Sequence, residues 1–125
     1  MKLRETAKQV HVLERSMELR DENTLPDTSA EQNLPESDIV LITGTAIENG
    51  RIDRLLELSE NAEEVAIVGP TAGILPTVLF KHGATIVGTV KVMNADKAMQ
   101  IIGEGGMPRA LSEATVRRVY RPALA

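Results

Sequence analysis

The chain has 125 residues, of which 42% are hydrophobic, so it is long enough and apolar enough to bury one core. Its net charge of −4 and pI near 5.2 argue against a general nucleic-acid or anionic-membrane partner, because both require excess positive charge. The sequence contains no cysteine, which excludes disulfides, thiolate metal sites and cysteine nucleophiles. We expect a cytoplasmic protein, since no apolar run approaches the roughly 20 residues of a membrane helix and no signal-peptide core follows Met1.

The amino-terminal segment is predicted to form a short helix and a strand. Residues 2–8 have room for about two helical turns, and residues 9–14, QVHVLE, have the β-branched residues of a strand. Glu14 stands at the carboxyl end of that strand, where open α/β sheets bind ligands, so it is a candidate to accept hydrogen bonds or coordinate a hard cation. The alternative is a solvated glutamate that begins a loop beside Arg15.

A polar, acidic connection follows at residues 16–37. Such a long link is unusual as bare loop, so we expect a short helix between Asp27 and Leu34, capped by Asp27 or Thr28. The acidic residues of the connection are not spaced as in a calcium loop, which favours a solvated surface.

Residues 38–58, DIVLITGTAIENGRIDRLLEL, predict a strand, a tight turn and a helix. The uninterrupted apolar run at residues 39–42 is typical of a strand that is buried on both faces. Gly44 ends the strand. From Arg51 onward, the apolar residues recur at helical spacing on one face and the charged residues fall on the other, which predicts an amphipathic helix.

The second half of the chain repeats this order of elements. Residues 64–69 and 84–92 predict two further apolar strands, with a helix over residues 74–82 between them. Pro76 must lie near the first position of that helix, because proline is tolerated only there. Asn94 is predicted to cap the next helix. Residues 112–120 fit either a last helix or a last strand, and this choice stays open.

Helices between consecutive strands predict right-handed crossovers and a mainly parallel sheet. We therefore expect one α/β domain over residues 1–125, a small Rossmann-like three-layer domain whose sheet has at least four strands. The sequence contains no GxGxxG motif, so the fold by itself does not indicate a nicotinamide cofactor.

The candidate ligand site lies in the two turns that follow the central strands. Thr43, Thr45 and Asn49 offer two hydroxyls and an amide at a helix amino end, where backbone N–H groups favour an anion. The alternative is purely structural: the threonines close the turn, Asn49 caps the helix and the glycines permit tight backbone. The predicted ligand-binding residues are Glu14, Thr43, Gly44, Thr45, Asn49, Gly69, Pro70 and Thr71.

Three segments in this order resemble the putative heavy-metal chelation domain family, a family of unknown function. They are DIVLITGTAIENGRIDRLLEL, VAIVGPTAGILPTVLFKHG, and IVGTVKV with the following helix that ends in GEGG; the match runs from about Val10 to Gly106. The resemblance implies the family's C-terminal Rossmann-like domain. In the family an enolase-like N-terminal domain precedes it, and a pocket at their interface is the proposed active site. From the resemblance we expect the printed sequence to lack that N-terminal domain and also the first strand and glycine turn of the Rossmann-like half.

Two functions from different classes follow. The first is binding of a small anionic molecule, a divalent metal or a metal chelate at the carboxyl ends of the strands; without cysteine or a histidine pair, direct metal contacts would suit hard cations. The second is a structural or protein-interaction module without activity of its own. Its partner would be another copy in a homo-oligomer or a separate chain that carries the N-terminal domain. No nucleophile or acid–base pair is identified, so no enzymatic reaction is inferred.

Overall fold

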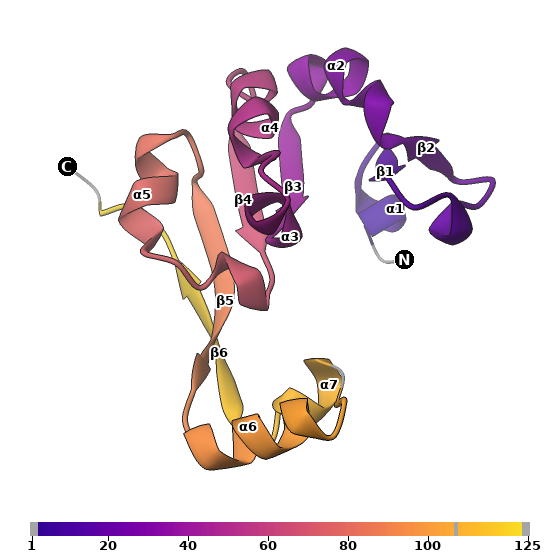
Figure 1. The fold of residues 1–125 in the computed structure, drawn as a ribbon. Coiled ribbons are helices and arrows are strands. Elements are labelled where there is room, and N and C mark those ends of the chain that lie inside the picture. Colours follow the sequence, from indigo (N-terminus) through magenta and orange to yellow (C-terminus); the bar gives the residue numbers. More distant parts are fainter. Residues whose placement is uncertain (1–2, 107, 124–125) are drawn as a thin grey trace.

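The computed structural model describes residues 3–106 and 108–123, which form two sheets and several short helices (Figure 1). The main sheet contains β3 (Ile39–Thr43), β4 (Glu64–Val68), β5 (Ile86–Val92) and β6 (Thr115–Tyr120), in that order across the sheet. The pairs β3–β4 and β4–β5 are parallel, and β5–β6 is antiparallel. The prediction of an α/β fold with a mainly parallel sheet of at least four strands is confirmed.

The helices are α1 (Leu3–Thr6), α2 (Ala30–Asn33), α3 (Thr45–Glu48), α4 (Ile52–Leu58), α5 (Pro76–Lys81), α6 (Ala95–Gly103) and α7 (Pro108–Leu111). Of these, α3, α4 and α5 connect the parallel strands of the main sheet, as predicted for crossovers. Pro76 is the first residue of α5, as predicted. The side chain of Asn94 accepts a hydrogen bond from Lys97 N at 3.0 Å, which confirms the predicted cap of α6. None of the helices within residues 3–106 and 108–123 has the length and apolarity needed to cross a membrane.

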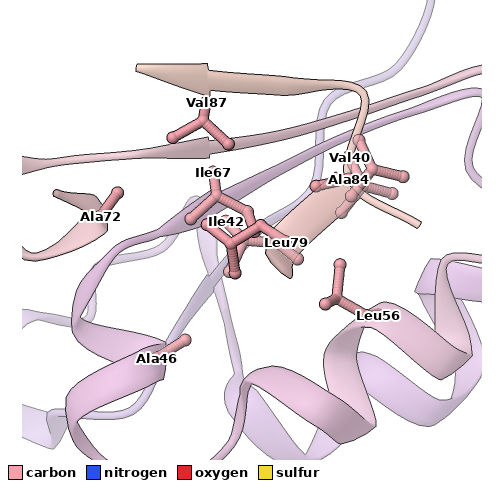
Figure 2. Packing of buried hydrophobic residues seen from close by; sticks show 10 residues of the cluster. Val40, Ile42, Ala46, Leu56, Ile67, Ala72, Leu79, Ala84 and Val87 are labelled. Atoms are coloured by element: carbon pink, nitrogen blue, oxygen red, sulfur yellow. The ribbon is translucent and has the colours of Figure 1, made fainter. Parts of the chain in front are cut away.

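The core lies between one face of the main sheet and the helices α3, α4 and α5 (Figure 2). Ile67 of β4 and Val87 of β5 have no exposed surface, because the central strands are flanked on both sides and covered on this face. The core residues are Val40, Ile42, Ala46, Leu56, Val65, Ile67, Ala72, Leu79, Ala84 and Val87. Small side chains from α3 and from η4 (Pro70–Ala72) let these two short elements approach the sheet closely.

The opposite face of the main sheet is exposed. Ile39 and Leu41 of β3 are 71% and 65% exposed, although both are large and apolar. Of the three layers that the sequence predicts, the described residues thus supply the sheet and one helical layer. The third layer would have to cover this second face.

Three finer expectations need correction or completion. Residues 112–120, whose sequence fits either a helix or a strand, contain the strand β6, which pairs with β5 along six residues. Strand β1 (Val12–Glu14) pairs in parallel with β2 (Thr24–Pro26) in a separate sheet. Neither Asp27 nor Thr28 caps a helix: they lie within the 3-10 turn η2 (Asp27–Ser29), and the Asp27 carboxylate is bound to Arg51 instead.

Because one face of the main sheet is buried and the other is exposed, truncating an isoleucine on each face should lower the free energy of unfolding by different amounts. Ile67→Ala should lower the free energy of unfolding by about 2–5 kcal/mol, because it leaves a cavity in the core. Ile39→Ala, the matched change on the exposed face, should cost less than about 1 kcal/mol. Urea denaturation followed by circular dichroism measures both. Equal costs would mean that the second face is covered in solution.

Candidate functional site

Two turns meet at the carboxyl edge of the parallel strands β3 and β4. The register pairs Thr43 with Val68, so both strands end at the same level. Beyond the strands, Gly44 N donates to Val68 O at 2.8 Å and Gly69 N donates to Gly88 O at 2.9 Å. These bonds extend the ladder by one step and fix the first residue of each turn.

The two turns touch each other at Gly44. A Cβ atom at this position would lie 2.6 Å from the Thr71 hydroxyl oxygen and 2.7 Å from the Ala72 backbone nitrogen. Real Cβ atoms do not approach other atoms this closely, and one of the two neighbours is backbone. Only glycine therefore fits between β3 and α3 while η4 keeps its place, and Ala72 keeps its fully buried position in the core.

Threonine hydroxyls gather at this contact. The Oγ1 atoms of Thr43 and Thr45 lie 3.1 Å apart, within hydrogen-bond distance, and both side chains are exposed. Thr71, also exposed, contributes the hydroxyl that lies against Gly44. Each hydroxyl both donates and accepts hydrogen bonds, so the group suits a ligand that carries oxygen atoms. The backbone N–H groups of Thr45 and Ala46 precede the first backbone bond of this turn, from Ile47 N to Gly44 O at 3.0 Å, and so have no acceptor within α3 itself.

Gly69 and Pro70 shape the second turn. Gly69 has φ of +141°, a conformation that other residues rarely adopt, and it places Pro70 at the first position of η4. The Pro70 carbonyl accepts a hydrogen bond from Thr89 Oγ1 of β5 at 3.4 Å. These two residues support the backbone, and the exposed hydrogen-bonding side chain of this turn is Thr71.

Asn49 is the C-cap residue of α3 and lies three residues before the start of α4. Its Oδ1 accepts a hydrogen bond from the backbone N–H of Arg51 at 3.2 Å, the pattern of a side chain that closes a turn. The side-chain oxygen of Asn49 therefore has the structural role of closing this turn. The amide nitrogen remains a potential donor to a ligand.

Glu14 ends β1, as predicted, but β1 lies in a different sheet from the two turns. Its Oε1 accepts a hydrogen bond from Ser16 N at 2.8 Å, and its backbone carbonyl accepts one from Arg20 Nε at 2.7 Å. The carboxylate is therefore engaged within its own loop. Among the described residues, its hydrogen-bond partners are Ser16 and Arg20 and do not include Thr43 or Thr71.

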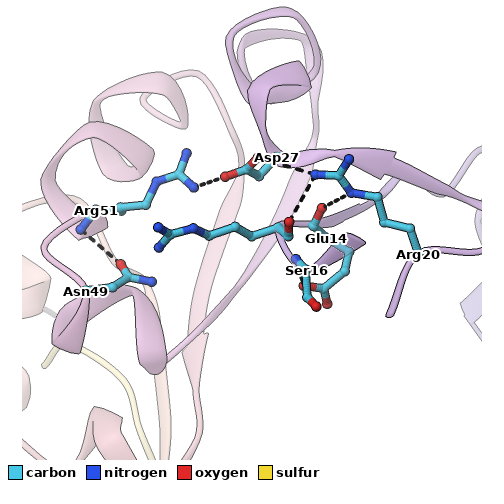
Figure 3. A network of polar contacts seen from close by, with 7 residues as sticks. Glu14, Ser16, Arg20, Asp27, Asn49 and Arg51 are labelled. Atoms are coloured by element: carbon cyan, nitrogen blue, oxygen red, sulfur yellow. Dashed lines mark hydrogen bonds and ion pairs between the residues drawn. The ribbon is translucent and has the colours of Figure 1, made fainter. Parts of the chain in front are cut away.

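Glu14 instead borders a polar network that connects β1 to α4 (Figure 3). Asp27 is its centre: Arg51 Nη1 donates to Asp27 Oδ2, and Arg20 Nη2 lies 3.8 Å from Asp27 Oδ1. The hydrogen bond from Arg51 holds the pKa of Asp27 below its ordinary value, and the charges of Arg51, Arg20 and Arg15 act in the same direction. Sequence patterns do not reveal this network, because Arg51 lies 24 residues from Asp27 in the chain and the pair forms only when the chain folds.

Two shallow hollows lie away from the paired turns. One, of about 420 Å³, lies between α2 and α4, where its charged groups are already paired as Asp27–Arg51 and Glu31–Arg54. The other, of about 450 Å³, lies between α6 and α7 and holds the ion pair Lys97–Glu113. Glu104, which also lines the second hollow, accepts a hydrogen bond from Gln100 Nε2 at 2.9 Å. The charged side chains of both hollows thus already have partners within the chain.

The side chains do not form a metal centre of the usual kind. Within residues 3–106 and 108–123, no group of three or more histidine, aspartate or glutamate side chains could hold a metal ion. His82 is the residue that follows α5 as its C-cap, and its backbone N–H donates to Leu79 O at 3.1 Å. The donors at the paired turns are hydroxyl and N–H groups, which fit an anion better than a bare heavy-metal ion.

Comparison with known proteins identifies the family. The family model described as putative heavy-metal chelation matches residues 1–121. The chain belongs to this family. A solved structure of a member from Pyrococcus horikoshii superposes with a TM-score of 0.88 at 30% identity, over 95% of this chain and 49% of that one. A second, from Desulfitobacterium hafniense, gives a TM-score of 0.79 at 31% identity, over 90% of this chain and 44% of that one.

These members of the putative heavy-metal chelation family are themselves described as proteins of unknown function. A curated relative, an uncharacterized protein from Methanocaldococcus jannaschii, is 37% identical over 90 residues, which is 72% of this chain and 35% of that protein. The chain thus spans about half the length of the two solved relatives and about a third of the curated one.

Replacing Gly44 should disturb the paired turns. We expect Gly44→Ala to lower the free energy of unfolding by about 1–3 kcal/mol, because its methyl group would overlap Thr71 and the Ala72 backbone. Gly103→Ala at the end of α6 is the matched control: it meets no atom within 4 Å and should be neutral or slightly stabilising. Urea denaturation compares the two variants. A neutral Gly44→Ala would show that the turns separate without cost.

The network at Asp27 predicts a dependence of stability on acid. Because the pKa of Asp27 is lowered in the folded chain, its stabilising contact is present above the ordinary aspartate pKa of about 3.9 and is lost as the pH falls through the folded value. Asp27→Asn should therefore lower the urea midpoint at pH 7 and reduce its further fall at low pH. Asp53→Asn on the exposed surface of α4 is the control, and an equal acid response of both variants would contradict the prediction.

Proposed function

We propose that the paired turns bind a small anionic ligand, such as a phosphate-bearing molecule or an anionic metal chelate. The observation that carries the proposal is the grouping of the exposed hydroxyls of Thr43, Thr45 and Thr71 at the carboxyl edge of β3 and β4. This edge is where open parallel sheets hold their ligands. Hydroxyl and N–H donors satisfy the oxygen atoms of an anion without requiring a charged side chain.

A metal would reach this site with its own ligands. The family description suggests heavy-metal chelation, but the donor set at the turns fits the oxygen atoms of a chelating molecule better than a naked soft metal ion. In this proposal the chelating molecule coordinates the metal, and the threonines together with Asn49 bind the outer oxygens of the complex. A related alternative is a hard divalent cation bound through carbonyl groups and water. Thermal-shift screening with metal chlorides and with metal–citrate complexes distinguishes this cation from a chelate.

The second candidate function is that of an interaction module. It is favoured by a specific observation, the large apolar side chains that remain exposed on the second face of the main sheet. Such a face is costly to leave in water and typical of a surface that a partner covers. The two functions are compatible, because a partner on this face would stand beside the turn at Thr43.

Thermal-shift screening tests the ligand proposal. The probes are inorganic phosphate, nucleotides, divalent metal chlorides and metal–citrate complexes. An anion or chelate should raise the melting temperature of the wild-type chain, and Thr43→Ala, Thr45→Ala and Asn49→Ala should reduce the shift. Thr43→Ser keeps the hydroxyl and should restore most of it. The absence of any shift, or equal shifts in the wild type and the alanine variants, would refute the proposal; a shift with metal chlorides alone would assign the site to a hard cation.

A further inference from the structure

The edge strand β3 has the sequence of an interior strand. Within the described residues it is hydrogen-bonded only to β4, so its other edge has no neighbouring strand. Its five residues, IVLIT, contain no proline and no charge, the devices by which natural sheets protect a free edge. Strands that are apolar on both faces usually lie inside a parallel sheet and are covered on both sides.

The exposed face of the sheet is continuous with this edge. Ile39 and Leu41 of β3 lie on it, and the strand register places Val68, Gly88 and Val119 in one row across β4, β5 and β6. Val68 and Val119 are 43% and 69% exposed, and Gly88 leaves the row without a side chain at its centre. We call the surface formed by Ile39, Leu41, Val68 and Val119 the open face.

The direction of winding indicates what kind of element covers the open face. The connections from β3 to β4 and from β4 to β5 place α3, α4 and α5 together on the core face. Crossovers between parallel strands are right-handed, so the side on which a helix lies depends on the direction in which the chain moves across the sheet. Consider a strand added beside the free edge of β3, from which the chain continues to a further strand still farther from β3. The chain then moves across the sheet in the direction opposite to that from β3 to β5, so the connecting helix would lie on the open face.

The solved relatives show that more polypeptide belongs to this family. The chain covers 49% and 44% of the two solved members, so each carries about as much chain again. We infer that the free edge of β3 and the open face dock a β-strand and an apolar helix face from a polypeptide equivalent to that unmatched part. This inference rests on the second candidate function, the interaction module, and names its partner. It is separate from the ligand site and touches it only because Thr43 follows Leu41 on the same face of β3.

A second copy of the chain satisfies these surfaces less well. Antiparallel pairing of two β3 strands about a twofold axis would close both edges, but the two open faces would lie on the same side and stay exposed. Face-to-face packing would cover the open faces and leave both edges free. A strand followed by a helix closes the edge and covers the face together, which is why we assign the surface to such a segment.

Co-expression tests the assignment. The tagged chain is produced together with the unmatched part of the Pyrococcus horikoshii protein, so that each polypeptide can fold against the other. We expect the untagged part to co-purify with the wild-type chain in a 1:1 ratio and to be reduced at least about tenfold by Leu41→Glu, which places a charge on the docking face. Met99→Glu on α6, at 69% exposure, is the matched control and should retain the partner.

Two results would overturn the inference. One is the absence of co-purification, or equal recovery by Leu41→Glu and Met99→Glu. The other is a dimer of the chain alone, measured by light scattering and dissociated by Leu41→Glu, which would assign the open face to a second copy. Circular dichroism verifies that Leu41→Glu is folded, and Ile39→Glu replaces it if it is not.

A labelling measurement supplies a readout that does not require a destabilising charge. Because the chain contains no cysteine, Leu41→Cys gives a single thiol on the open face. Its reaction with a maleimide should be fast in the chain alone and slower in the complex, whereas Met99→Cys should react equally in both. The two proposals can fail separately. If no ligand shifts the melting temperature, the labelling and co-purification results still stand; if no docking is found, the thermal shifts with phosphate or chelate still stand.

Discussion

The close approach of Gly44 to the backbone of Thr71 and Ala72 is the constraint on which the rest of the site depends. It requires the parallel register that ends β3 and β4 at the same level, and it requires a residue without a side chain at position 44. When both conditions hold, Ala72 enters the core, the Thr71 hydroxyl lies against position 44, and the paired hydroxyls of Thr43 and Thr45 flank that position in the chain. The same contact therefore stabilises the fold and builds the candidate ligand site.

Because the helices α3, α4 and α5 all cover one face of the main sheet, the other face stays exposed. Every core residue contributed by a helix comes from the side of α3, α4 and α5. Burial of apolar side chains is the main favourable term in folding, and here it is concentrated on one face, with Ile67 and Val87 at its centre. Large side chains such as Ile39 and Leu41 contribute little to that term until something covers them, so the chain retains apolar surface that can stabilise an association.

The sequence could predict the elements whose causes are local. The apolar runs of β3, β4 and β5, the turn glycines, Pro76 at the start of α5 and Asn94 at the cap of α6 all depend on residues within one turn or one strand. The ends of consecutive parallel strands share an edge, so the meeting of the two turns was also within reach of sequence reasoning.

What escaped prediction depends on contacts between distant residues. The last segment is a strand because β5 continues past the sheet core and offers it an edge, and nothing local in residues 112–120 decides between helix and strand. Asp27 would be a good helix cap by its type, but Arg51, 24 residues away, offers its carboxylate a charged partner. Strand β1 likewise pairs with β2 and not with a strand of the main sheet. The residues of β1 predict a strand, but they do not determine its pairing partner.

The family description and the residues of this chain are reconciled if the metal is recognised through its chelator. Soft metals select thiolate and imidazole ligands, whereas this chain has no cysteine and two histidines, of which His82 serves the end of α5. Hydroxyl and backbone N–H donors recognise shape and oxygen positions, and by themselves they discriminate weakly between anions. Specificity for one chelate would then require a second wall that excludes the others. Because Thr43 and Leu41 lie on one face of the same strand, a segment docked on the open face would stand where such a wall is needed.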